Sequence, residues 1–131
     1  MGKKIDNIPP LSVYISDFIN IVETAQKDFK WNYEEVNRLD RLTQDYLHTL
    51  ELDNLDYNGR AKIATQLSKC RQLRRESKNS VEVLQPLIEF LDSDKGKYLL
   101  NILKEILGKT RKAETYIENR SYKRRVLQDN E

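Results

Sequence analysis

Apolar residues at heptad spacing, in a long stretch of chain without helix breakers, constrain the fold most strongly. Residues 11–58 contain no Gly and no Pro. Within them, one row of positions follows alternating spacings of three and four residues. Apolar side chains occupy Ile15, Phe18, Val22, Ala25, Phe29, Val36, Leu39, Tyr46 and Leu50, and the intervening positions Asn32 and Thr43 are polar. This spacing is typical of one long, coiled-coil-like helix. Continuity through Asn32 is favoured, although Asn32 and Glu35 also fit the start of a new helix.

Two further helices are predicted after turns at residues 52–59 and 92–96. We call such a row of residues at heptad spacing a seam, and the row in residues 11–58 is the first. The second seam consists of Ile63, Leu67, Cys70, Arg74, Ser77, Val81, Leu84, Ile88 and Leu91, and the third of Leu99, Leu103, Ile106, Thr110, Ala113 and Ile117. Pro86 predicts either a kink in the second helix or a restart at that residue. Because short turns make consecutive helices antiparallel neighbours, we predict an all-α, elongated antiparallel bundle of three long helices.

The composition predicts one bundle domain over residues 11–120, between a polar lead at 1–10 and a basic, flexible tail at 121–131. Charged residues make up 34% of the chain and hydrophobic residues 38%, a balance that suits helices with large exposed faces. No apolar run is long enough for a transmembrane helix, so no membrane partner is expected. A single Cys and no recognisable signal peptide favour the reducing cytoplasm.

Pairing the first two helices about Asn54 brings their polar seam positions to nearly one level. Leu39 then meets Cys70, Thr43 meets Leu67, Val36 meets Arg74 and Asn32 meets Ser77. We interpret Asn32, Arg74 and Ser77 as a polar layer that sets the register, and Cys70 as a core residue. If the third helix folds back onto the second, Ala113 lies near Arg74, and carboxylates surround this layer from Glu34, Glu35, Glu114 and Glu118.

A concentrated basic segment admits two interpretations. Residues 58–80 carry seven Lys and Arg side chains and one Glu, in a chain whose net charge is +2. The candidate contacts to a nucleic acid or acidic partner are Arg60, Arg71, Arg75 and Lys78, with Arg120, Lys123, Arg124 and Arg125 in the tail. For residues 69–78, we favour ion pairing inside the protein. Arg74 is then paired, and Arg71 and Arg75 stay free. For the tail, the sequence favours neither a solvated role nor a binding role over the other.

The sequence lacks the residue sets that common catalytic and metal sites require. The chain has one His and one Cys, too few for a zinc cluster or a Cys–His pair with an orienting His. Asp45 and His48 match half of a di-iron motif that requires two such pairs. The four Gly residues are scattered, so no phosphate-binding loop is formed. We therefore expect no enzyme activity, no metal and no cofactor.

Aromatic residues outside the predicted seams indicate a protein interface. The candidates are Trp31, Tyr33, Tyr57 and Tyr98. Trp and Tyr are favoured where partners bind because they bury a large area at low entropic cost. The same side chains could instead cover a second side of the bundle.

Three stretches carry a resemblance to a known group of proteins. They are LTQDYLHTLEL at residues 42–52, RAKIATQLSKCRQLRRESKNSVEVLQPLIEFLDSDKG at 60–96 and ENRSYKRR at 118–125. These stretches resemble small, uncharacterised coil-containing helical proteins of phages and prophages of Gram-positive bacteria, over about residues 36–125. The resemblance implies a cytoplasmic phage accessory protein that binds and redirects host machinery or blocks host defence. It implies no functional residue.

Three functions therefore stand as expectations. The leading one is a non-catalytic helical module that binds a host or defence protein. The second is a nucleic-acid-binding accessory protein that uses the basic helix face and tail. The third is a self-associating bundle, in which the acidic residues 1–57 of one copy meet the basic residues 58–80 of another.

Overall fold

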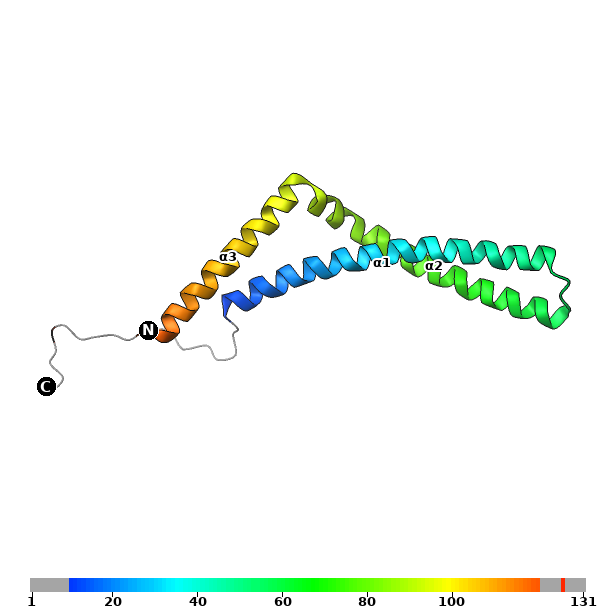
Figure 1. Cartoon of the computed structure of the whole chain (residues 1–131), viewed down its shortest axis with the longest axis horizontal. Coiled ribbons are helices and arrows are strands. Elements are labelled where there is room, and N and C mark those ends of the chain that lie inside the picture. The colour runs from blue at the N-terminus through cyan, green and yellow to red at the C-terminus, as the bar shows by residue number, and fades with distance from the viewer. Residues whose placement is uncertain (1–9, 121–125, 127–131) are drawn as a thin grey trace. The chain divides into compact units, whose positions relative to one another are not determined.

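The computed structural model describes residues 10–120 and residue 126, and it consists of three α-helices (Figure 1). They are α1 (Leu11–Leu52), α2 (Tyr57–Asp92) and α3 (Asp94–Asn119). The predicted all-α class with three long, mutually packed helices is confirmed. The bundle domain expected over residues 11–120 is divided between two compact units. We call Ile21–Lys97 the hairpin unit, and the described parts of Met1–Asn20 and Tyr98–Glu131 the terminal unit.

The first helix is continuous, as the unbroken seam predicts. Pro10 precedes it, and its carbonyl accepts the Val13 N–H at 3.0 Å. The alternative of a break at Asn32 is wrong, because the Asn32 side chain donates to the Asp28 carbonyl at 2.8 Å, inside the same helix. The helix ends where Asp53 and Asn54, both residues that favour turns, follow Leu52.

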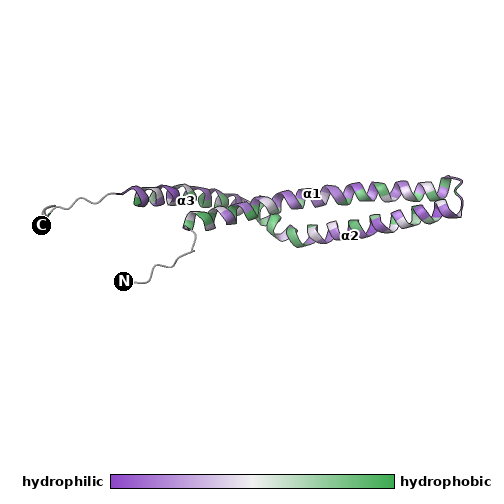
Figure 2. Ribbon diagram, turned by 90° about the horizontal axis from the view of Figure 1, so that it is seen from below, coloured by the Kyte–Doolittle hydropathy of each residue, from purple (hydrophilic) through white to green (hydrophobic). Residues whose placement is uncertain are grey.

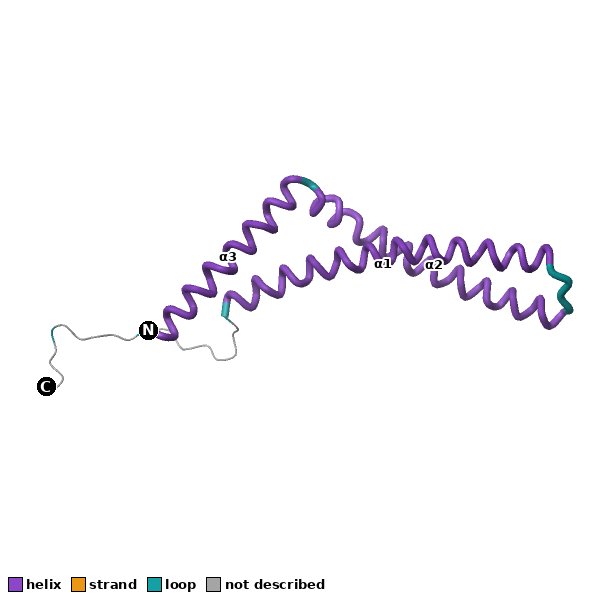
Figure 3. The backbone as a smooth tube through the Cα atoms, in the orientation of Figure 1, coloured by secondary structure: helices purple, strands orange, loops and turns teal. Residues whose placement is uncertain are grey.

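The two connections between helices are shorter than predicted, as the loop segments in Figure 3 show. Only residues 53–56 separate α1 from α2, and Ser93 alone separates α2 from α3. Asp56 caps α2, since its carboxylate accepts the Gly59 N–H at 2.7 Å. Gly59 and Gly96, expected in the turns, therefore lie in the first turns of α2 and α3.

Ser93 caps two helices at once. Its backbone N–H and its hydroxyl both donate to the Phe90 carbonyl at the end of α2. Its Oγ accepts the Gly96 N–H at 3.1 Å at the start of α3. Gly96 fits there because it is buried against the backbone of Phe90 and Leu91, where any Cβ would collide. One residue thus satisfies polar groups of both helix ends, which explains so tight a corner.

The second helix passes through Pro86 without interruption. Pro86 lies inside α2, so the alternative of a new helix starting there is wrong. Proline has no N–H, so the Glu82 carbonyl loses its usual partner within the helix. Pro86 and Glu82 are both exposed, and water can reach that carbonyl.

The core of the hairpin unit lies where Leu39, Thr43 and Cys70 meet between α1 and α2. Leu39 is 1% exposed, and its carbonyl accepts hydrogen bonds from the Thr43 hydroxyl at 2.8 Å and the Cys70 thiol at 3.4 Å. Thr43 Oγ1 lies 3.5 Å from Cys70 Sγ. The predicted Leu39–Cys70 pairing and the burial of Cys70 are confirmed. Thr43 was expected to face Leu67, and it contacts Cys70.

In the terminal unit, α3 lies against the start of α1, and the two helices run in opposite directions (Figure 1). Glu114 Oε2 accepts the Ser12 N–H at 3.2 Å. The expectation that Glu114 lies near Arg74 stays a prediction, since the two residues belong to different units. Ser12 and Ile19 are buried, whereas Phe18 of the predicted seam is exposed. The third predicted seam is also corrected, because Leu99, Ile106, Ala113 and Ile117 are exposed.

Candidate interaction surfaces

The first candidate surface is a groove between α1 and α2 in the hairpin unit. It is lined by Asp28, Asn32, Asn79, Ser80, Val83 and Leu84. Trp31 follows Asp28 by three residues, so it stands on the same side of α1, and it is 60% exposed. The groove thus combines amide, hydroxyl and carboxylate groups with an apolar wall, and the exposed indole of Trp31 stands outside its lining, one helical turn from Asp28. Sequence reasoning missed Asn79, Ser80 and Val83. Val83 lies outside the predicted seam, which is the signal that could have found it.

The second candidate surface lies on the other side of the hairpin. Arg74 forms an ion pair with Asp40 of α1. This pair replaces the one expected with Glu34 and Glu35. Arg71, Arg75 and Lys78 share the helical face of Arg74 by their spacing, and Arg60 falls on the same face. Tyr33, seven residues before Asp40, lies on the same side of α1. We call this surface, made of Arg60, Arg71, Arg74, Arg75 and Lys78 with Asp40 and Tyr33 beside them, the basic face.

Most cations of the basic face have no carboxylate partner. Within residues 10–120, Arg60, Arg71, Arg75 and Lys78 form no ion pair. The three arginines are exposed and Lys78 is half-buried. The first acidic residue after Lys78 along α2 is Glu82, four residues further on. The favoured expectation, that Arg74 is paired internally while Arg71 and Arg75 stay free, matches this arrangement, although the partner of Arg74 differs.

The structure does not bring the four candidate aromatic residues together. Trp31 lies beside the groove, whereas Tyr33 lies on the basic face and stacks on Phe29 at a ring-centroid distance of 6.1 Å. Tyr57 is exposed at the start of α2, beside the connection to α1. Tyr98 is also exposed but belongs to the terminal unit. They therefore mark separate surfaces.

The three residues of the predicted polar layer have different surroundings. Arg74 reaches Asp40, and Ser77 is buried between the helices. Asn32 lines the groove and bonds within its own helix. The buried polar contact between α1 and α2 is made by Thr43 and Cys70. A register-setting role for Asn32, Arg74 and Ser77 stays a prediction.

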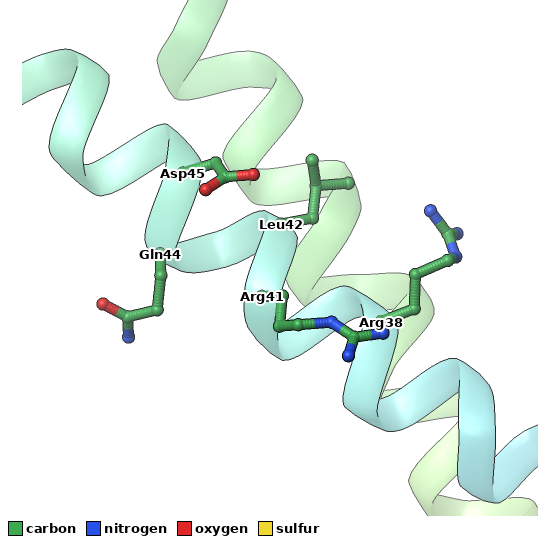
Figure 4. A pocket seen from close by; sticks show the side chains of 5 residues that line it. All are labelled: Arg38, Arg41, Leu42, Gln44 and Asp45. Atoms are coloured by element: carbon green, nitrogen blue, oxygen red, sulfur yellow. The ribbon is translucent and has the colours of Figure 1, made fainter.

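A second depression, formed by residues of α1 alone, has no convergent chemistry. Arg38, Arg41, Leu42, Gln44 and Asp45 line it, and Figure 4 shows their side chains spreading around the helix without meeting at one point. Arg38 donates to Glu35 at 2.5 and 3.0 Å. These hydrogen bonds lower the pKa of the Glu35 carboxyl and raise the pKa of Arg38. Arg38 is exposed, Glu35 is half-buried and the two residues lie one turn apart on α1, so the pair contributes little to stability.

No cluster of three or more His, Cys, Asp or Glu side chains suited to a metal ion occurs in the part of the chain that the structure describes. Over the same residues, none of the helices has an apolar stretch that could span a bilayer. Apolar and polar residues are instead mixed along each helix (Figure 2). In the tail, Arg120 is exposed, and Lys123, Arg124 and Arg125 lie outside the described residues.

The chain matches no known family model, and no curated protein or solved structure shows significant similarity to it.

Proposed function

We propose that this protein is a non-catalytic helical module that binds another protein through the groove beside Trp31. The observation that carries the proposal is an exposed Trp next to a groove with both apolar and hydrogen-bonding walls. Binding energy at protein interfaces concentrates on such aromatic anchors, surrounded by polar groups that orient the partner. An amphipathic helix or extended segment would place its apolar side chains against Val83 and Leu84, with polar groups on Asn32 and Asn79.

The class of partner follows from the resemblance to phage and prophage proteins. It implies a host or defence protein as the target, and modulation or inhibition of that target as the outcome. We place the encounter in the cytoplasm, since a lone buried thiol suits a reducing compartment.

Replacing Trp31 with Glu tests this proposal. A charge in place of the indole removes the anchor, so we expect capture of the partner from a lysate of a Gram-positive bacterium to be lost. The matched control is Tyr33→Glu, two residues away and 56% exposed, on the other side of the hairpin. It should retain capture. The recovered partner, once purified, should bind the wild-type chain and the control in solution but not Trp31→Glu. Equal loss in both variants, or no specific partner from any lysate, would contradict the proposal.

Nucleic-acid binding is a second candidate, favoured by the unpaired cations of the basic face. Their charges would neutralise phosphates and release counterions, so affinity should fall steeply as salt rises. For the double variant Arg71→Ala and Arg75→Ala, we expect the slope of log affinity against log salt for duplex DNA to shrink by about two. Fluorescence anisotropy measures this slope.

Lys62→Ala provides the control for this second candidate. Lys62 is exposed on α2 but lies nine residues before Arg71, on the opposite side of the helix. Its removal should leave the slope unchanged. Binding that ignores salt, or an equal change in the control, would remove nucleic acid as a candidate.

A further inference from the structure

Each of the two helices in the terminal unit has two adjacent seams. One seam is buried or half-buried, and the other is exposed. On α1, Ser12 and Ile19 are buried, and Ser12 contacts Glu114 of α3. On α3, the half-buried seam in phase with Glu114 consists of Leu100, Leu103, Leu107, Thr110 and Glu114. These residues follow the alternating spacings of three and four that one packed helix face requires.

The second seam is exposed on both helices. On α1 it consists of Leu11, Tyr14 and Phe18, and on α3 of Ile106, Ala113, Tyr116 and Ile117. The large side chains among these seven are between 41% and 65% exposed. Within α3, Gly96 is the only buried residue that the structure shows. The apolar side chains of this helix thus lack a complete core.

The two exposed seams lie on the same side of the helix pair. Each is offset by one residue from the corresponding packed seam, with Leu11 before Ser12 on α1 and Ile106 before Leu107 on α3. Each is therefore rotated about 100° in the same sense around its own helix. Because α1 and α3 run in opposite directions, equal rotations bring both seams to one face. We call this face, made of the seven residues above, the apolar face.

We propose that the apolar face binds the same face of a second copy of this chain, so that two terminal units form a four-helix bundle. Taking roughly 200 Å² for a fully exposed large side chain, the six large side chains expose about 650 Å² per copy. Two copies would bury about 1,300 Å² from these side chains alone, within the range of stable interfaces. Lys109 is the one charged residue that the one-residue offset places on this face, so like-charge repulsion, which would oppose a twofold interface, is limited to that residue.

The charges beside the apolar face support the same partner. Asp17 lies one residue before Phe18 of the exposed α1 seam, and Lys109 lies in the exposed α3 seam, one residue before Thr110. The Ser12–Glu114 contact joins the two antiparallel helices, and Asp17 and Lys109 each lie five residues from it, in the same direction along the pair. A second copy related by a twofold axis parallel to the helices would set Asp17 of one chain beside Lys109 of the other. This interface differs from the pairing of charged segments that the sequence suggested.

The inference is independent of the proposed function, because the groove beside Trp31 belongs to the hairpin unit. The experiment is light scattering over a series of concentrations, on the full chain. We expect a mass twice the 15.5 kDa of one chain at high concentration. Phe18→Glu with Ile106→Glu should reduce it to the mass of one chain, while Trp31→Glu should leave the dimer intact. Loss of partner capture in Trp31→Glu with an intact dimer separates the two proposals.

A charge exchange tests the partner itself. Asp17 and Lys109 are both exposed, so replacing them leaves the fold unchanged. Asp17→Lys should weaken the dimer about tenfold, because each dimer has two such pairs. Adding Lys109→Asp should restore the affinity. A single-chain mass at every concentration would overturn the proposal, and so would failure of the exchange to restore the dimer. Dimers that persist in Phe18→Glu with Ile106→Glu, with helix content unchanged by circular dichroism, would also overturn it.

Discussion

Leu39→Ala is expected to destabilise the protein by about 2–5 kcal/mol, since it removes the most buried large side chain between α1 and α2. The Leu39 carbonyl, which accepts from Thr43 and Cys70, remains in the variant. The loss therefore reports on apolar contact and on the cavity left behind, and the hydrogen bonds stay. Chemical denaturation followed by circular dichroism at 222 nm, a wavelength that reports helix content, measures the free energy of unfolding.

Leu47→Ala is the matched control for this change. Leu47 lies two turns further along α1 and is 42% exposed, so its truncation removes less buried area than the truncation of Leu39. A loss below about 1 kcal/mol is expected there. Equal losses at Leu39 and Leu47 would mean that the α1–α2 contact is not the core of the hairpin unit.

Gly96→Ala is expected to cost about 3 kcal/mol or more, at or above the upper end of the range for overpacking. A Cβ at this position would lie 2.0 Å from the Phe90 carbonyl oxygen and 2.8 Å from Leu91 Cα. Both are backbone atoms, so no side chain can rotate away and the corner at Ser93 must open. Thermal unfolding should show a lower midpoint, and hydrogen exchange should be faster at the amides next to Ser93.

Gly108→Ala should have the opposite effect. Gly108 also lies in α3, but a Cβ there would meet no atom within 4 Å. Alanine favours the helix over glycine and restricts the unfolded chain, so a gain of about 0.4–1 kcal/mol is expected. If both substitutions shift stability in the same direction, the account of Gly96 as a close backbone contact is wrong.

The hairpin could be predicted from sequence because its constraints are local. A helix without Gly or Pro and a short turn determine which residues face each other to within about one turn, and Leu39 does meet Cys70. That precision is not enough to assign ion pairs. Asp40 and Glu35 are little more than one turn apart on α1, and Arg74 reaches Asp40.

The packing of α3 could not be predicted because its sequence carries two apolar seams one residue apart. Leu99, Leu103, Ile106 and Thr110 follow a regular spacing, yet only Leu103 and Thr110 are half-buried. Heptad spacing identifies an apolar side of a helix but not which of two adjacent seams meets a neighbour. The same ambiguity explains why Phe18 was expected inside, where the structure has Ile19.

The candidate surfaces were only partly accessible to sequence reasoning. Exposure of Trp31 and Tyr33 follows from their places outside the seam. Their separation follows from spacing as well, since two residues along a helix differ by about 200°. The walls of the groove on α2 depend on how two helices align, which single-helix patterns do not contain.

The single-residue corner at Ser93 has a consequence for how the sequence can change over evolution. The rotational phase of α3 is counted from that corner, and each residue turns the helix by about 100°. One residue gained between Ser93 and Tyr98 would move Leu99, Ile102, Ile106, Lys109 and Ala113 into the five half-buried positions of the packed seam, so four of the five would be apolar. One residue lost there would bring Lys104, Gly108 and Arg111 into the same positions. An insertion at this corner therefore keeps most of the packed seam apolar, with Lys109 at the position of Thr110, whereas a deletion leaves the seam without a large apolar side chain.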